Sequence, residues 1–144
     1  MNKQNLHLAS DLRTVIARLS KKMRKKSVWA DKLSLTERST IGSINQYGTV
    51  LASELALIEK ITTQSMSQIL NHLLELGLII KTPSETDKRK VLISLSDTGL
   101  DLLYKSRSEK EEWLNKVLSE NFSNEERAIL SKAIGPLTRL VDFD

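Results

Sequence analysis

A row of polar, uncharged side chains recurs near the middle of the chain at the spacing i, i+3, i+4 and i+7, which is one face of a helix. Its members are Gln64, Ser67, Gln68 and Asn71. Amides and hydroxyls both donate and accept hydrogen bonds, and amides match the major-groove edge of adenine. A helix face that only meets solvent usually carries Lys and Glu instead. The row therefore favours a surface that reads base edges over an ordinary solvated face.

The face opposite this row is apolar, as expected for a helix packed on a core. Its members, at the same spacing, are Met66, Ile69, Leu70 and Leu73. Thr62 is placed to cap the N-terminus, where free backbone amides suit a phosphate. Gly77 stands where a helix C-terminus is expected. An amphipathic helix is therefore predicted between Thr62 and Gly77.

Two apolar segments follow, 79–81 and 91–95, and the loop between them reads PSETDKRK. They predict a β-hairpin whose basic tip can reach phosphates or the narrow minor groove. Asp87 lies two residues before Arg89, where its carboxylate can pair with the guanidinium and fix its direction. A surface charge cluster without any partner accounts for this loop equally well.

The residues before the row predict the rest of a helix-turn-helix. A helix is expected over 35–44 with Thr36 as its cap, and residues 46–48 break it. Residues 49–50 are expected to form a short strand beside the hairpin. The buried stripe of the next helix is expected to be Leu51, Leu55 and Ile58. The fold class is therefore mainly α with a small β-wing, a winged helix-turn-helix that lays one helix in the major groove of DNA.

Four short segments in this region are specific when their order and spacing are taken together. They are SELA at 53–56, LLELGLI at 73–79, DKR at 87–89 and the LSDTG that follows the hairpin. Residues 35–103 resemble the central part of the MarR family of bacterial regulators. The resemblance implies an obligate homodimer whose two winged lobes bind a palindromic double-stranded DNA, usually as a repressor. It also implies that Arg89 enters the minor groove while Asp87 holds it.

The resemblance further implies that residues 63–65, 67 and 68 lie on the DNA side of the recognition helix. The complete set expected to contact DNA is Thr62, Thr63, Gln64, Ser65, Ser67, Gln68, Asn71, Asp87, Lys88, Arg89 and Lys90. Two departures from the family pattern matter. Leu51 stands where a capping Thr is common, and no Arg or Lys lies between Thr62 and Leu76. An arginine contact to guanine is therefore missing from this helix, and base readout should depend on its amides.

Both ends of the chain predict long amphipathic helices. The first has an apolar stripe of Leu8, Leu12, Val15, Ile16, Leu19 and Met23. After the hairpin, Ser96 can cap a helix that runs to about Asn121, and Ser123 with Glu126 forms a capping box for a last helix. Gly135-Pro136 predicts a kink or break in that helix.

One domain over 1–144 is expected, because its length permits a single core. Residues 33–96 would form the DNA-reading lobe, and residues 1–30 and 97–144 a helical dimerisation lobe. The apolar stripes at both ends need a cover, which a symmetric partner provides.

Charge is unevenly distributed along the chain. The net charge of +4 divides into +7 over residues 1–48, zero over 49–95 and −3 over 96–144. This asymmetry favours one face that meets phosphate over uniform coating of nucleic acid. The basic run from Lys21 to Lys26 either binds phosphate beside the wing or is a solvated helix end, where cations suit the helix dipole.

The sequence gives little support for catalysis. It has no cysteine, and its two histidines, His7 and His72, show no metal-ligand spacing. We expect no metal, no cofactor and no enzymatic activity. No signal peptide or membrane span is expected, so the predicted location is cytoplasmic.

Three functions remain open at this point. The leading one is a homodimeric repressor released by a small ligand, because members of the family often bind aromatic carboxylates or phenols between their lobes. Trp29, Tyr47 and Tyr104 could line such a crevice, although aromatic side chains are more often core. The second is a winged-helix module for protein contacts without specific DNA readout. The third is an enzyme or carrier that uses the same crevice.

Overall fold

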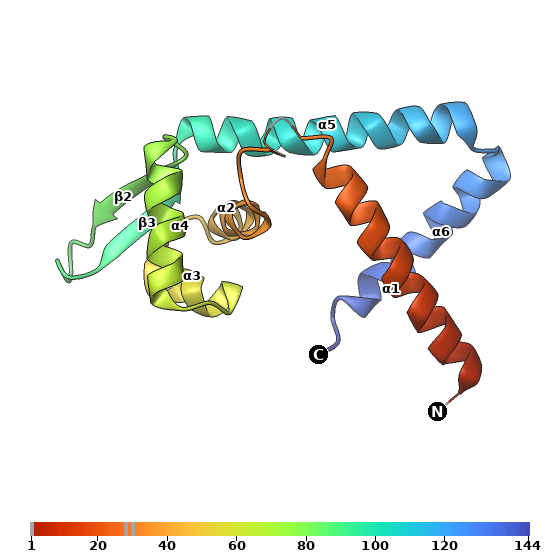
Figure 1. The fold of residues 1–144 in the computed structure, drawn as a ribbon, viewed down its shortest axis with the longest axis horizontal. Coiled ribbons are helices and arrows are strands. Elements are labelled where there is room, and N and C mark those ends of the chain that lie inside the picture. The colour runs from red at the N-terminus through yellow and green to blue at the C-terminus, as the bar shows by residue number, and fades with distance from the viewer. Residues whose placement is uncertain (1, 28, 30) are drawn as a thin grey trace.

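The computed structural model describes residues 2–27, 29 and 31–144. Within these residues, six helices and three short strands follow one another (Figure 1). In chain order they are α1 (Lys3–Arg24), α2 (Leu35–Tyr47), β1 (Val50–Leu51), α3 (Ala52–Glu59), α4 (Thr63–Glu75), β2 (Ile79–Pro83), β3 (Val91–Leu95), α5 (Asp97–Asn121) and α6 (Asn124–Leu140). The predicted class, mainly α with a small wing, is confirmed. Met1, Val28 and Ala30 belong to the expected lobe 1–30 but lie outside the described residues.

The wing is a three-stranded antiparallel sheet in the order β1-β3-β2. Val50 of β1 pairs with Ile93 of β3, and Ile79 of β2 pairs with Leu95. The short strand expected before α3 is therefore present, one residue later than predicted. Its pairing with β3 ties the start of the helix-turn-helix to the hairpin that follows it.

The core lies where α2, α3 and α4 pack on one another and on this sheet. Its largest fully buried side chains are Ile44, Leu55, Met66, Leu70, Leu73, Leu78 and Ile93. The predicted apolar face of α4 is confirmed, and Ile69 packs partly buried beside it. The stripe expected on α3 is partly wrong, because Ala56 is buried while Ile58 is 37% exposed. Lys60 takes the left-handed conformation and ends α3 after eight residues, so Ile58 lies in a last turn at the solvent.

Most helices in the described residues begin and end where the sequence predicts. Thr62 caps α4, and Gly77, with φ of 73°, follows its last residues as predicted. The cap of α2 is Ser34 and not Thr36. The Ser34 hydroxyl accepts from the backbone N–H of Glu37, whose carboxylate accepts from the Ser34 N–H. This reciprocal capping box satisfies two free amides, whereas Thr36 lies one residue inside the helix.

The helix α3 starts without a side-chain cap from Leu51, because that side chain has no acceptor. The Glu54 carboxylate instead accepts from the backbone N–H of Leu51 at 3.3 Å. Glu54 therefore compensates on one side only for the capping Thr that Leu51 replaces.

The long helix α5 extends from the sheet to the far end of the molecule, where α6 turns back (Figure 1). Ser96 caps α5 as predicted, and α5 ends at Asn121. Of the kink or break expected in α6, the break does not occur, since the helix continues through Pro136 to Leu140. The carbonyl that loses its partner to proline belongs to Lys132, which is exposed and can bind water.

Gly99 sits where α5 touches the start of β2. A Cβ atom at this position would lie 2.1 Å from the carbonyl oxygen of Leu78. The same carbonyl accepts from the backbone N–H of Ser96, and the Ser96 hydroxyl donates to the carbonyl of Gly77. The LSDTG segment therefore fixes the start of α5 against the winged lobe, and only glycine fits this approach.

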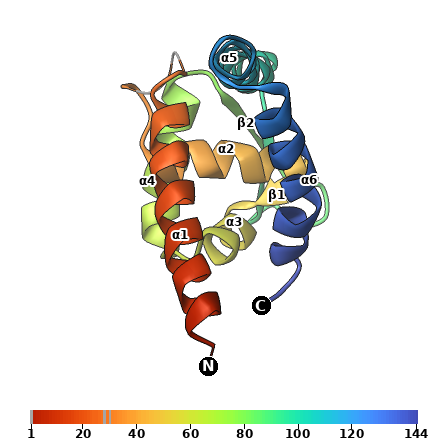
Figure 2. The ribbon, with the colours of Figure 1, turned by 90° about the vertical axis from the view of Figure 1, so that its right-hand side faces the viewer.

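The two terminal helices, α1 and α6, leave their apolar faces uncovered. Figure 2 shows them as two helices that lie apart from each other beneath α5. Their exposed apolar side chains include Leu8, Val15, Ile16 and Leu19 on α1 and Ile129, Leu130 and Ile134 on α6. Val15 is 59% exposed and Ile134 is 61% exposed. Burial of these faces therefore requires something that this chain does not itself supply.

Candidate nucleic-acid interface

The polar row lies on the exposed side of α4. Gln64, Ser67, Gln68 and Asn71 are all exposed, whereas the opposite face of the helix is in the core. Within the described residues, the amides of Gln64 and Gln68 have no hydrogen-bond partner in the chain. They present both a donor and an acceptor to whatever meets this face.

The N-terminus of α4 is held by a small hydroxyl network. Thr62 Oγ1 accepts from the backbone N–H of Ser65 at 3.1 Å, and its hydroxyl donates to Ser65 Oγ at 2.9 Å. Both hydroxyls are therefore used in shaping the helix start, while Thr63 next to them is exposed. The structure gives Thr62 and Ser65 a capping role in addition to the predicted contact with DNA.

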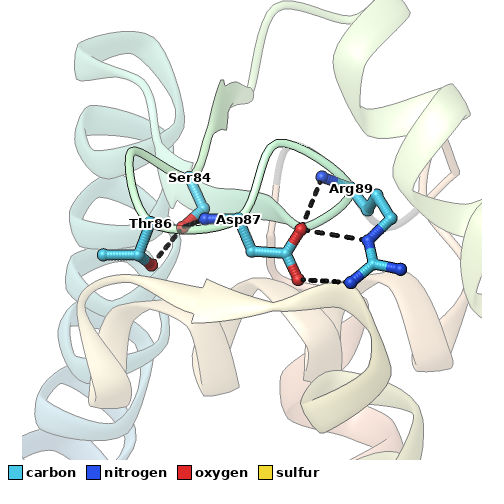
Figure 3. Close-up of polar contacts among 4 residues, drawn as sticks. All are labelled: Ser84, Thr86, Asp87 and Arg89. Carbon is cyan, nitrogen blue, oxygen red and sulfur yellow. Dashed lines mark hydrogen bonds and ion pairs between the residues drawn. The ribbon is translucent and has the colours of Figure 1, made fainter.

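The wing tip holds its arginine with a carboxylate. Asp87 Oδ1 accepts from the backbone N–H of Arg89 at 3.0 Å and from its Nε at 3.2 Å, and Oδ2 accepts from Nη2 at 3.5 Å (Figure 3). The ion pair predicted from spacing is confirmed. The Arg89 side chain is 91% exposed, so the guanidinium is aimed by Asp87 while it stays open to a ligand.

The rest of the loop is closed by a few further contacts. Ser84 Oγ lies 3.1 Å from Thr86 Oγ1 and accepts from the backbone N–H of Asp87 at 3.4 Å (Figure 3). The Ser84 N–H donates to the Lys90 carbonyl, and the Lys90 N–H donates to the Asp87 carbonyl, each at 3.0 Å. The side chains of Lys88 and Lys90 remain exposed. The tip is thus a shaped turn that presents three cations.

Two contacts of α4 with its neighbours were not expected from the sequence. His72 Nδ1 contacts Glu37 Oε2 of α2, and Lys81 Nζ of β2 donates to Asn71 Oδ1 at 3.0 Å. Both partners lie far apart in sequence, so no local spacing signals them. The His72 contact joins α4 to α2.

Burial raises the pKa of Glu37, but hydrogen bonds from the Ser34 backbone, from His72 and from the Ser34 hydroxyl outweigh it. The net effect is a pKa below 4.5. Glu37 is therefore a carboxylate at neutral pH that joins the cap of α2 to the recognition helix.

Comparison with known proteins agrees with this geometry. The family model described as "MarR family" matches residues 32–90. A Mycobacterium bovis protein, an uncharacterized HTH-type transcriptional regulator, is 30% identical over 135 residues, which are 94% of this chain and 93% of that protein. The chain belongs to the MarR family.

Solved structures extend the likeness of this MarR protein over the whole chain. A Pseudomonas aeruginosa protein described as a transcriptional regulator is 32% identical, with a TM-score of 0.89, and the match covers 99% of this chain and 100% of the other. A Staphylococcus aureus MepR mutant, solved bound to an oligodeoxyribonucleotide, is 18% identical with a TM-score of 0.71, over 93% of this chain and 97% of the other. That second likeness shows the fold alone. The chain is therefore a helix-turn-helix transcriptional regulator with a DNA-binding fold.

A cavity of about 80 Å³ lies in this MarR protein between α2, α5 and the segment that joins α1 to α2. Its lining includes Trp29, Leu33, Arg38, Leu102, Ser106 and Lys110. Within the described residues, Trp29 Nε1 and Arg38 Nε are buried without a hydrogen-bond partner. Burial lowers the pKa of Lys110, and the nearby charges of Arg38, Arg107 and Arg24 lower it further. The cavity thus combines apolar walls with unpaired donors and positive charge.

The three aromatic residues predicted for a ligand crevice are not brought together within this chain. Trp29 lines the cavity, whereas Tyr47 and Tyr104 are absent from its lining and are 55% and 54% exposed. The cationic side of the cavity was missed, because Arg38 and Lys110 are distant in sequence.

The basic run at the end of α1 forms a shallow hollow of its own. Its lining consists of Arg18, Lys21, Lys22, Lys25 and Lys26. Lys26 Nζ lies 5.3 Å from the centre of the Trp113 ring on α5. In Figure 1 this end of α1 lies beneath α5, with α4 between it and the wing. The structure therefore does not place the run beside the wing of its own chain.

Within the described residues, no group of three His, Cys, Asp or Glu side chains is arranged to hold a metal ion. None of the helices in that part of the chain is long and apolar enough to span a bilayer.

Proposed function

We propose that this protein is a homodimeric repressor that binds a palindromic double-stranded DNA with sequence specificity and is released by a small ligand. The observation that carries the proposal is the exposed amide face of α4 beside a wing whose Arg89 is aimed by Asp87. In this arrangement the amides of Gln64 and Gln68 read base edges in the major groove, while Arg89 enters the adjacent minor groove.

Phosphate contacts would come from the cations and free amides around this face. Lys88 and Lys90 flank Arg89 at the wing tip, and the first turn of α4 presents backbone N–H groups. Thr62, Thr63, Ser65 and Ser67 belong to the same proposed surface. Such contacts set orientation and affinity, whereas the amides set the sequence.

The uncovered apolar faces of α1 and α6 support the homodimer. Large side chains such as Val15 and Ile134 are more than half exposed in the single chain. A second copy related by a two-fold axis covers both helices at once and places two winged lobes side by side. A palindromic site with half-sites about 10 bp apart, centre to centre, follows from that symmetry.

The cavity between α2 and α5 supports release by a ligand. Its unpaired Trp29 and Arg38 N–H groups and the Lys110 ammonium suit a small carboxylate, and its apolar wall suits an aromatic ring. A ligand there would push α2, which belongs to the winged lobe, away from α5, which leads into α6. It would thereby change the spacing of the two reading helices and weaken DNA binding.

Selection of bound sequences from a random duplex pool tests the function, with fluorescence anisotropy on selected and scrambled duplexes. We expect an inverted repeat among the selected sequences, a dimer by light scattering, and tighter binding to the selected duplex. Equal affinity for both duplexes with a weak salt slope would replace the proposal by a protein-interaction module. Catalysis of a reaction without DNA binding would favour an enzyme or carrier. A repressor of this kind acts on the chromosome in the cytoplasm.

A further inference from the structure

A hydrogen bond joins the polar face of α4 to the wing. The Lys81 ammonium of β2 donates to Asn71 Oδ1 at 3.0 Å. Asn71 lies in the same helical row as Gln64 and Gln68, and it is exposed. Lys81 is half-buried, so its ammonium lies at the protein surface, next to any molecule that contacts α4.

The sheet register explains why this lysine reaches α4. Side chains alternate along a strand, and Lys81 shares a face with buried Ile79, whereas Ile80 between them is 47% exposed. Across the ladder Lys81 pairs with Ile93, which is fully buried. Its aliphatic stem therefore starts on the core side of the sheet, and its ammonium emerges at the edge of α4.

This bond changes what Asn71 can offer to a base. An ammonium has donors and no acceptor, so only the amide oxygen can face it. One of the two lone pairs of that oxygen is thereby used, and the amide N–H groups remain free. The ammonium also keeps donors beyond the one that it gives to Asn71. The pair therefore presents more donors than acceptors, whereas Gln64 and Gln68 keep a donor and an acceptor each.

Adenine and guanine differ in which of these two sets of hydrogen-bonding groups they match in the major groove. Adenine offers an acceptor at N7 and a donor at its amino group, and so it needs an amide with a free oxygen. Guanine offers two acceptors, N7 and O6, and lysine is one of its usual partners. A pair rich in donors fits guanine, whereas at adenine the Lys81 ammonium would face an amino group that is itself a donor.

We propose that Lys81 and Asn71 together read a guanine in each half-site, an inference that rests on the DNA-binding function proposed above. The helix itself has no Arg or Lys between Thr62 and Leu76. Lys81 supplies from the wing the cation that the recognition helix lacks. For Asn71 this proposal differs from the expectation that the amides of this face match adenine.

Selection from a random duplex pool, repeated with Lys81→Met and Lys81→Arg, tests the proposal. The wild type is expected to select a guanine at one position of each half-site. Lys81→Met should lose about tenfold or more of its preference at that position and keep its preferences elsewhere. Lys81→Arg, which still donates to guanine, should retain it. Lys88→Met is the comparison for a phosphate contact, since it should weaken all sequences alike.

A second measurement separates base contact from structural damage. Replacing that guanine by 7-deazaguanine removes the N7 acceptor and keeps the base pair. The wild type should then lose affinity, whereas Lys81→Met should bind both duplexes equally. If Lys81→Met instead weakens all duplexes alike with a lower salt slope, Lys81 is a phosphate contact and the proposal is overturned. If the wild type selects no sequence at all, the proposed function itself fails.

Discussion

Removal of the wing arginine should weaken DNA binding strongly and leave the fold almost intact. The Arg89 side chain is 91% exposed and its bonds within the chain are those to Asp87, so Arg89→Ala removes an exposed ion pair worth about 0–1 kcal/mol of stability. A direct arginine contact with a base is worth about 1–3 kcal/mol. A symmetric dimer loses two such contacts, so about 2–6 kcal/mol, or roughly 30-fold to 10⁴-fold in Kd, is expected.

Fluorescence anisotropy on the selected operator, together with thermal unfolding, measures both effects. Asp87→Asn is the matched variant, because its amide oxygen can still accept from the backbone N–H of Arg89 while the charge that aims the guanidinium is lost. An intermediate loss of affinity with an unchanged melting temperature is expected for it. Wild-type affinity of Arg89→Ala for the operator would refute the role of the wing, and a large fall in its melting temperature would refute the exposure argument.

Four further variants test other parts of the molecule. Gln68→Ala should relax the preference at one base pair per half-site, as read by sequence selection, and an unchanged preference would remove Gln68 from the reading face. Gly99→Ala places a methyl 2.1 Å from a backbone carbonyl oxygen and should cost about 1–3 kcal/mol or more in urea unfolding. Its control is Gly42→Ala, where a Cβ meets nothing within 4 Å and about 0.5–1 kcal/mol of stabilisation is expected. The pKa of Lys110 is lowered, so protonated Lys110 destabilises the folded state relative to the unfolded state. The stability of the protein should therefore rise with pH as that proton is lost. Lys110→Met should remove this rise in melts between neutral pH and 10.5 and abolish the response to aromatic carboxylates. The pKa of Glu37 is lowered, so its carboxylate stabilises the fold at pH values above 4.5. Glu37→Gln should therefore unfold more easily than the wild type at neutral pH, and the two proteins should become equally stable in this respect in acid.

Local patterns were sufficient for most of the winged lobe. The apolar period predicted the buried face of α4, and Thr62 and Gly77 predicted its ends, because these features depend on residues within a few turns of one another. The Asp87 and Arg89 pair is also local, two residues apart on one turn. Ser34 and Glu37, three residues apart, form a capping box that is equally local, and the expected cap at Thr36 is wrong.

Contacts between elements could not be read from local patterns. His72 meets Glu37 across 35 residues, and Lys81 meets Asn71 across 10 residues and a strand boundary. Each depends on how α4 is rotated against its neighbours, which is decided by the packing of the whole core. The division into lobes 33–96 and 1–30 with 97–144, and the DNA contacts themselves, stay predictions.

The sequence by itself determined which helical face is apolar and where α4 begins and ends, and it placed an arginine and a carboxylate two residues apart at the wing tip. Those properties depend on side-chain chemistry repeated along one element, and a chain of this pattern has few other ways to bury its apolar groups. Only the tertiary structure decided which side chains share a hydrogen bond across elements. The Lys81 bond with Asn71 uses part of the acceptor that this amide offers in the sequence, because two strands and a helix must pack before an ammonium can reach that amide.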